Sequence, residues 1–352
     1  MSHARTLYPL LTESRLVAPM WSGSRLAALL GVEADMPRVG ESWQVYEGNR
    51  ITNGPLAGQT LAEATHALGE ALVGSRTVAR YGADFPLLAK LIDAGDRLSV
   101  QVHPDDAYAH RVEAGSGFHG KTEAWHILAA DPGASLIYGF ARPTSPAEVA
   151  AAVADDALLD LLQHIPAAAG DTVYVPAGTV HAIGGGILLY EIQQKSDITY
   201  RLYDYGRKDA RTGRPRELHV AKSLDVLDFT PPGRGRLAPL ALAPGRDLLV
   251  ACPFFALERW QADEPRALTT DPGTFEILTV IDGSLDVQWA GGTLELHRQS
   301  AVLPAGLGEY TLAPRDSCRW LRAYVPDLAA GLVEPLRAAG YSEDAIQTVV
   351  MN

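Results

Sequence analysis

Glycine and proline interrupt almost every apolar stretch of this chain, and no other feature limits its folding so strongly. The 352 residues include 33 glycines and 23 prolines, and 47% of the chain is apolar. Proline lacks the backbone N–H that a helix needs, and glycine lowers helix stability. Both residues are common in the turns that join short strands. The sequence therefore predicts a mainly β protein rather than a helical bundle, and its length suggests two domains.

Short strands and turns are predicted in both halves of the chain. Residues 85–103 read as two strands about a turn, and residues 121–140 as a hairpin with its turn at 131–133. Residues 247–325 again alternate strands and turns, after a linker rich in Gly and Pro at 230–245. The two halves look like diverged copies of one β unit.

Helical patterns are confined to short segments. Residues 60–80 are rich in Ala, Leu and Glu at helical spacing, and residues 144–164 begin with a capping signal at Ser145-Pro146. We expect the following domains: a first domain at 1–235 with a helical insert at about 144–164, a second domain at 236–328, and a C-terminal helical segment at 329–352.

Charge and cysteine content exclude several functions. Lysine and arginine number 30 against 42 acidic residues, and this net charge of −12 opposes general binding to nucleic acid or anionic membranes. Cys252 and Cys318 are too few for a disulfide framework or a cysteine zinc site. The chain shows no apolar leader and no apolar run long enough to cross a membrane. We expect a cytoplasmic protein, a monomer or small homo-oligomer, with neither membrane nor nucleic acid as partner.

Four side chains that can bind a metal come from three short segments. Gln101 and His103 are separated by one residue, so they point to the same face of a strand. Glu123 begins the next predicted strand, and His181 lies near the start of another. Two imidazoles and a carboxylate suit Zn²⁺ and also Fe²⁺ or Mn²⁺. Each histidine taken alone could equally be a hydrogen-bonded core residue.

The motifs around these residues resemble a known family. The spacing G-x5-P-x-G-x2-H from Gly170 to His181 is similar to the second cupin motif, whereas Gln101-x-His103 replaces the usual H-x-H of the first. The chain also carries, in order, LSVQVHPDD at 98–106, GKTE at 120–123, VPAGTVHAIG at 175–184 and EIQQKSDITYRLYD at 191–204. This set resembles the type I mannose-6-phosphate isomerases of the cupin superfamily, in their compact bacterial form.

The resemblance implies a fold, a cofactor and a reaction. It implies two cupin domains, which are jelly-roll β-barrels, with a short helical insert and C-terminal helices. It implies one zinc ion per chain in the first domain, held by His103, Glu123 and His181, with Gln101 as a weaker fourth ligand. The implied reaction interconverts D-mannose 6-phosphate and D-fructose 6-phosphate through an enediol.

The resemblance also implies roles in catalysis. Glu191 is the leading candidate for the general base. Asp197 and Arg201 come after it in the same motif, and Arg201 matches the family's active-site arginine. The planar charged fork of Arg201 suits an enediolate or a phosphate. Lys121 could bind phosphate or relay a proton, and the metal could polarise the sugar oxygens or only orient the substrate. Two further positions match family residues near the phosphate, Lys90 and Ser99.

Local charge and the second half support this interpretation. Basic residues gather in one segment of an acidic chain, at Arg201, Arg207, Lys208, Arg211, Arg214, Arg216 and Lys222. In the second half, Leu303-Pro-Ala-Gly306 repeats part of the cupin motif, but Glu309 stands where the histidine would be. We therefore expect the second domain to be a degenerate cupin without a metal. His110 and His119 flank the loop between two ligand segments.

Three alternatives remain open at this point. The chain could isomerise a related or unphosphorylated sugar, because the motifs do not define the sugar. It could be a non-catalytic sensor of sugar phosphates, although intact Lys121, Glu191 and Arg201 argue against this. An iron-dependent cupin oxygenase is the weakest alternative.

Overall fold

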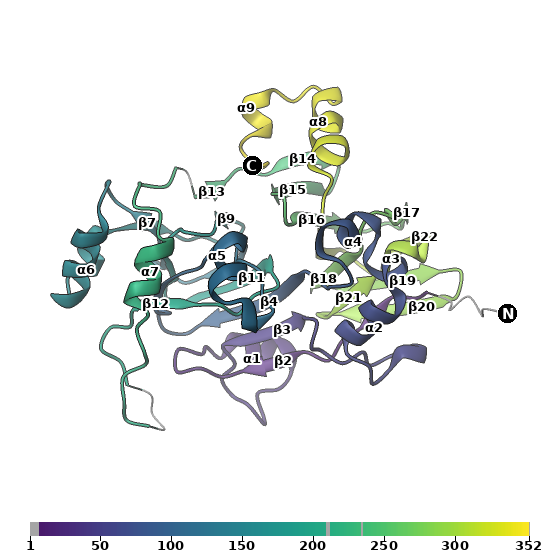
Figure 1. Cartoon of the computed structure of the whole chain (residues 1–352). Helices are drawn as coiled ribbons and strands as arrows, with labels where there is room; N and C mark the ends of the chain where they lie inside the picture. Colours follow the sequence, from purple (N-terminus) through teal and green to yellow (C-terminus); the bar gives the residue numbers. More distant parts are fainter. Residues whose placement is uncertain (1–6, 209–211, 234, 352) are drawn as a thin grey trace. The chain divides into compact units, whose positions relative to one another are not determined.

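Antiparallel sheets dominate the computed structural model, which describes residues 7–208, 212–233 and 235–351 (Figure 1). Contacts divide the chain into two units. The first unit contains Leu16–Ser42 and Lys90–Leu237, and the second contains the N-terminal segment to Arg15, Trp43–Ala89 and the chain from Ala238 onward. The mainly β class predicted from the glycine and proline content is confirmed.

The first unit is built on two antiparallel sheets. One has the strand order β13 (Arg236–Leu237), β9 (Thr172–Val175), β6 (Glu123–Ala130), β11 (Ile187–Gln194), β4 (Leu87–Ala94), β3 (Glu41–Val45) and β2 (Arg15–Val17). The other has the order β12 (Tyr200–Tyr203), β5 (Val100–Val102), β10 (His181–Ile183), β7 (Ser135–Phe140) and β8 (Leu162–Pro166). Trp125, Ile127 and Leu136 belong to one buried apolar cluster with residues of both sheets, so the unit is a β-sandwich.

The second unit repeats this plan. Its larger sheet has the order β1 (Leu10–Leu11), β21 (Ser300–Leu303), β18 (Glu276–Asp282), β23 (Cys318–Tyr324), β16 (Ala256–Ala262), β15 (Arg246–Ala251) and β14 (Leu240–Ala243). Its smaller sheet has the order β17 (Arg266–Thr269), β22 (Glu309–Pro314), β19 (Ser284–Trp289) and β20 (Gly292–His297). Leu278, Val287 and Trp320 share a buried cluster drawn from both sheets.

Helices are short throughout the described chain. The α-helices are α1 (Arg25–Leu30), α2 (Leu61–Leu68), α3 (Glu70–Val73), α4 (Ser75–Tyr81), α5 (Asp106–Val112), α6 (Pro146–Ala154), α7 (Val220–Val226), α8 (Glu334–Ala338) and α9 (Glu343–Ile346). Other helical turns are η1 (Gly54–Leu56), η2 (Ala114–Ser116), η3 (Leu158–Leu161), η4 (Ala305–Leu307) and η5 (Leu328–Val333). Within the described ranges, none of these helices has the length and apolar character needed to span a bilayer.

The predicted helical segments are found, with shorter helices than expected. Residues 60–80 form three helices because Gly69 and Gly74 interrupt them with positive φ angles of 53° and 88°. The insert at 144–164 holds α6 and η3, but its last residues belong to strand β8. The C-terminal segment at 329–352 contains most of η5 together with α8 and α9.

The predicted hairpin at 121–140 is wrong. Both strands exist as β6 and β7, but β6 pairs with β9 and β11 while β7 pairs with β8 and β10. The turn at 131–133 therefore carries the chain from one sheet to the other. Alternation of apolar residues indicates which face of a strand is buried, but it does not identify the partner strand.

The contact units do not follow the predicted domain boundaries. Residues 43–89 were expected within a continuous first domain at 1–235, but they belong to the second unit together with the C-terminal strands. The chain thus passes between units after Arg15, Ser42, Ala89 and Leu237. Three of these positions lie inside strands β2, β3 and β4, and a change of unit inside a strand leaves no mark in the composition of the sequence.

Candidate metal and active site

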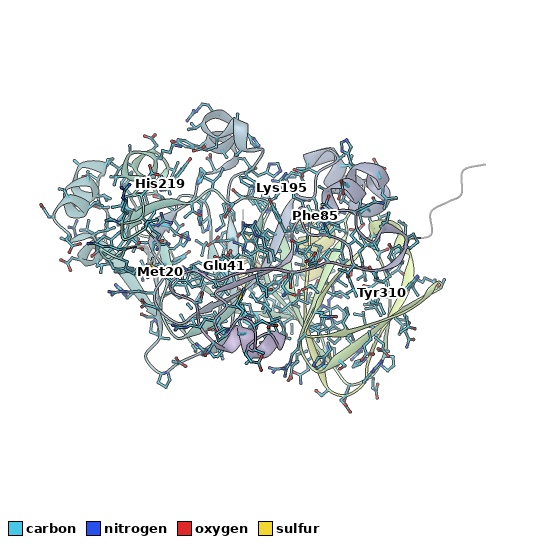
Figure 2. The ribbon with its side chains drawn as sticks, turned by 90° about the horizontal axis from the view of Figure 1, so that it is seen from below. Met20, Glu41, Phe85, Lys195, His219 and Tyr310 are labelled. Carbon is cyan, nitrogen blue, oxygen red and sulfur yellow. The ribbon has the colours of Figure 1, made fainter. Side chains whose placement is uncertain are left out.

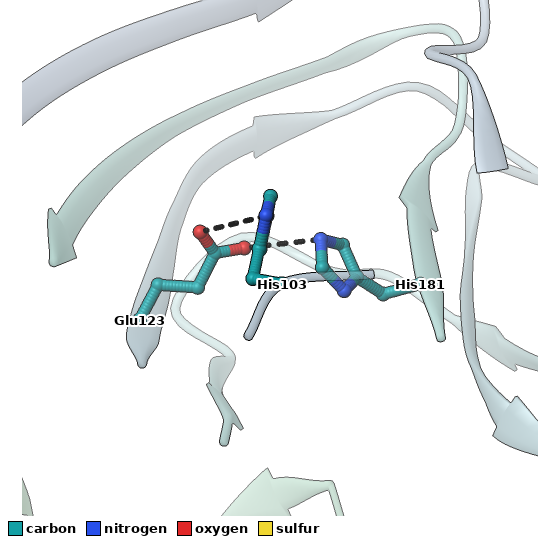
Figure 3. Close-up of side chains that lie close together, drawn as sticks. All are labelled: His103, Glu123 and His181. Atoms are coloured by element: carbon teal, nitrogen blue, oxygen red, sulfur yellow. Dashed lines mark ion pairs between the residues drawn. The ribbon is translucent and has the colours of Figure 1, made fainter. Parts of the chain in front are cut away.

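Three predicted metal ligands meet in the first unit. His103 follows β5, Glu123 begins β6 and His181 begins β10, so the two sheets bring them together (Figure 3). A Glu123 carboxylate oxygen lies 3.3 Å from Nε2 of His181, and the other lies 3.7 Å from Nε2 of His103. One ligand atom from each residue lies within 4.8 Å of the others, and each side chain is 1% exposed.

Backbone carbonyls orient both imidazole rings. Nδ1 of His103 lies 2.7 Å from the carbonyl of Ile198, and Nδ1 of His181 lies 2.8 Å from that of Thr179. With its proton on Nδ1, each ring donates to the carbonyl and turns the Nε2 lone pair toward Glu123. Burial lowers the pKa of His103 well below its ordinary value and that of His181 to about 4. Both rings are therefore neutral at physiological pH, which is the form that binds a metal.

Gln101 lies beside the cluster. It pairs with His181 across strands β5 and β10, and its side-chain amide nitrogen is 3.3 Å from Nε2 of His181. Exchange of the amide oxygen and nitrogen by a flip would aim the oxygen at the ligands, and the two orientations fit the same side-chain shape. Two imidazoles, one carboxylate and a neighbouring amide fit a zinc ion with an open position.

A row of charged side chains crosses the sheet next to these residues. Glu41, Lys90, Glu191 and Glu123 come from the neighbouring strands β3, β4, β11 and β6. The ammonium of Lys90 lies 3.6 Å from a Glu41 oxygen and 3.8 Å from a Glu191 oxygen. Glu41, labelled in Figure 2, was not among the predicted site residues, and its only signal was the GESW segment at 40–43.

Lys121 contacts both this row and the predicted metal ligands. Its ammonium lies 2.6 Å from a Glu123 oxygen, 3.0 Å from Nε2 of His103 and 3.9 Å from a Glu191 oxygen. Lys121 and Glu191 are 5% and 3% exposed. A buried ammonium in this position balances the charge of two carboxylates that would otherwise repel one another.

Burial and charge adjust the acidity of the row. Burial raises the pKa of Glu191, and the negative charge of Glu123 adds to this, while Lys90 and Lys121 oppose it. Burial alone would lower the pKa of Lys90, but Glu191 and Glu41 outweigh that effect and raise it. A carboxylate with a raised pKa beside fixed ammonium groups is suited to accept and return a proton.

Arg201 and Ser99 form a second group. The Arg201 guanidinium donates to Ser99 Oγ at 3.3 Å and to the carbonyl of Glu217 at 2.9 Å. The backbone N–H of Arg201 donates to Nδ1 of His219 at 3.1 Å. Among the described residues, the guanidinium donates to one hydroxyl and one carbonyl, and its charge can therefore serve an anion.

The remaining predicted residues are placed differently. Asp197 is exposed in the segment after β11, and its charge contributes to the raised pKa of Lys90. Arg207 and Arg216 both pair with Asp204 and are therefore partly neutralised. Arg211 lies outside the described residues. In the second unit, Glu309 is exposed on β22, so it does not replace the missing histidine within a buried site.

Comparison with known proteins places this site in a family. A model of the phosphomannose isomerase type I catalytic domain matches residues 15–124. A mannose-6-phosphate isomerase of Streptococcus mutans is 41% identical over 72% of this chain and 78% of its own length. The crystal structure of the Bacillus subtilis mannose 6-phosphate isomerase is 31% identical, covers 90% of this chain and 99% of its own, and has a TM-score of 0.80. A zinc-bound mannose 6-phosphate isomerase, 16% identical over 90% of this chain and 99% of its own, shares the fold with a TM-score of 0.71.

The double β-sandwich, the buried His–Glu–His cluster and these relatives together make the chain a cupin-fold aldose–ketose isomerase. The chain belongs to the type I mannose-6-phosphate isomerase family. This confirms the family and the fold that the motif order from residue 98 to residue 204 indicated.

Proposed function

We propose that this enzyme interconverts D-mannose 6-phosphate and D-fructose 6-phosphate through an enediol, with one zinc ion in the first unit. The observation that carries the proposal is that His103, Glu123 and His181 meet beside three buried charged residues. These are Lys90, Glu191 and Lys121. His103, Glu123 and His181 would hold the zinc, with Gln101 as a weaker ligand. When bound, the zinc supplies a Lewis acid that stabilises negative charge on the sugar oxygens.

The proton transfer is assigned to Glu191. Isomerisation moves a proton from C2 of the aldose to C1 of the ketose, so one base must reach both carbons. Glu191 is buried, has a raised pKa and lies 3.8 Å and 3.9 Å from two ammonium groups, which stabilise its ionised form when it returns the proton. Lys121 then donates hydrogen bonds to the sugar oxygens at C1 and C2, where charge develops in the enediol.

Arg201 and Ser99 bind the anionic substrate. Arg201 keeps a permanent charge and a fork of donors that matches a phosphate or an enediolate. Ser99 Oγ, 3.3 Å from its guanidinium, adds a hydroxyl at the same place. Asp197 and Lys90 act through charge: Asp197 raises the pKa of Lys90, and Lys90 holds Glu191 in position.

The test is a coupled assay of fructose 6-phosphate formation with protein stripped of metal and reloaded with zinc. We expect turnover of mannose 6-phosphate, none with unphosphorylated mannose, and loss of both zinc and activity in Glu123→Gln. Turnover of mannose at a comparable rate would favour an isomerase of unphosphorylated sugars. Tight binding of mannose 6-phosphate without turnover by the zinc-loaded protein would refute the proposal and favour a sensor.

A further inference from the structure

A second cluster of metal-ligating side chains lies outside the site described above. Asp106 and His110 are four residues apart on α5, so they share one face of the helix. His119 comes from the loop that follows. Ligand atoms of the three residues lie within 4.8 Å of one another, and Nε2 of His110 is 3.1 Å from Nδ1 of His119.

Hydrogen bonds hold the Asp106 carboxylate toward the loop. Its Oδ1 accepts from the backbone N–H of Gly120 at 2.9 Å and from the side-chain amide of Gln194 at 2.8 Å. Both of these bonds fall on Oδ1, so Oδ2 takes part in neither of them. Protein metal sites commonly fix their carboxylate ligands in this way.

The cluster shares no residue with the site at His103, Glu123 and His181. His110 is exposed, while Asp106 and His119 are half-buried, so solvent water can complete a coordination shell. A set of two imidazoles and one carboxylate binds Zn²⁺, Co²⁺ or Ni²⁺ in preference to Mg²⁺ or Ca²⁺.

We propose that Asp106, His110 and His119 form a second site for a divalent transition-metal ion. Such an ion would join α5 to residues 113–120, the segment that leads directly into Lys121 and Glu123. Lys121 is already anchored there, because its backbone N–H donates to the carbonyl of Pro104 at 2.9 Å. The second ion therefore stabilises the loop that places Lys121 and a zinc ligand, without touching the substrate.

A simpler explanation of the geometry is a direct hydrogen bond between the two rings. One neutral imidazole can donate to the other at 3.1 Å with no ion present. The two explanations differ in the number of ions bound per chain, so stoichiometry separates them.

The experiment titrates Co²⁺ into chelator-stripped, untagged protein and reads the bound ions by equilibrium dialysis and by cobalt absorption. We expect two ions per chain for the wild type, and binding at the second site at least about tenfold weaker in His110→Gln and His119→Gln. His181→Gln should lose the other ion and keep this one. The matched control is His66→Gln, at an exposed histidine on α2, which should still bind two.

Thermal unfolding separates loss of a ligand from loss of fold. Because His110 is exposed, His110→Gln and the wild type should melt at the same temperature in chelator. Added Co²⁺ should raise the midpoint less in His110→Gln than in His66→Gln. One ion per wild-type chain, or equal stoichiometry in the wild type and His110→Gln, would overturn the proposal. Isomerase turnover is measured separately, so neither result depends on the proposed reaction.

Discussion

At the scale of single residues, the sharpest prediction concerns Glu191. Glu191→Gln keeps the side-chain shape but cannot accept a proton, so we expect kcat to fall by about 10²–10⁴-fold. Zinc content should stay at the wild-type level, because Glu191 does not belong to the His103–Glu123–His181 group. Glu148→Gln, on α6 at a surface ion pair with Arg142, is the matched control and should keep full activity. An active Glu191→Gln variant would assign the base elsewhere.

Lys121 gives a second test at this scale, with two readouts that move in opposite directions. Lys121→Met keeps the apolar stem but removes the ammonium that lies 2.6 Å from Glu123 and competes with a metal for that carboxylate. We therefore expect zinc to bind at least as tightly, measured by chelator competition, while kcat falls by about 10²-fold or more. Lys222→Met removes an exposed, ion-paired lysine and should change neither. Loss of zinc in Lys121→Met would indicate a structural role instead.

Sequence motifs predict some residues of the candidate site but not others. His103, Glu123 and His181 could be predicted to lie together because each belongs to a motif at the start or just past the end of a strand. Glu41 could not be predicted, because its ion pair with Lys90 depends on the pairing of β3 with β4. These two strands are far apart in the sequence. A carboxylate without a motif becomes recognisable only when its neighbours are known.

At the scale of elements, buried ion pairs join neighbouring strands of the second unit. The guanidinium of Arg322 on β23 lies 2.7 Å from Glu276 on β18 and 3.4 Å from Glu258 on β16. Both carboxylates are fully buried, and Arg246 lies 2.8 Å from Glu258. Glu309 in place of a histidine led us to expect a degenerate domain. The ion pairs could not be predicted, because their residues lie on separate strands and belong to no motif. The same nonlocal pairing explains why the strands at 121–140 were located correctly and paired wrongly.

Arg322→Met tests this network through its dependence on pH. Removing one cation from buried carboxylates costs about 3–5 kcal/mol of unfolding free energy at neutral pH. Burial alone would raise the pKa of Glu258, but Arg322 and Arg246 outweigh it and lower the pKa below its ordinary 4.5. Stability from Glu258 is therefore fully present above pH 4.5 and is lost as the pH falls through the lowered value. The side chains that donate hydrogen bonds to Glu258 are those of Arg246, Trp260, Arg322 and Tyr324.

The difference between wild type and Arg322→Met should accordingly shrink in acid. Without its main cation, Glu258 protonates more readily, so the variant loses less stability than the wild type below about pH 4.5. Urea unfolding at neutral pH and near pH 4 measures both values. Arg319→Met, on the same strand with an exposed partner Asp282, is the control and should cost at most about 1 kcal/mol at either pH. A difference that is independent of pH would show that the loss reflects packing alone.

At the scale of the whole molecule, the sequence predicted two β units but not their composition. The repeat of strand and turn signals in both halves was enough to infer a duplicated plan. The division of the chain was not predictable, because residues 43–89 contribute to the second unit although they precede every predicted metal ligand. A continuous boundary at 235 is the natural inference from a linker signal, yet contacts rather than linkers decide which segments form a unit.

This division leads to a prediction for metal removal. Since His103, Glu123 and His181 all belong to the first unit, zinc held by them would stabilise that unit by binding its folded state only. At a free zinc concentration of about 100 times Kd, linkage adds about 2.7 kcal/mol to its unfolding free energy. The measurement is thermal unfolding with and without zinc in the His110→Gln background, which removes the proposed second site. We expect the zinc-dependent rise in midpoint to disappear when His181→Gln is added. An equal rise in the double variant would place the stabilising ion outside the His–Glu–His cluster.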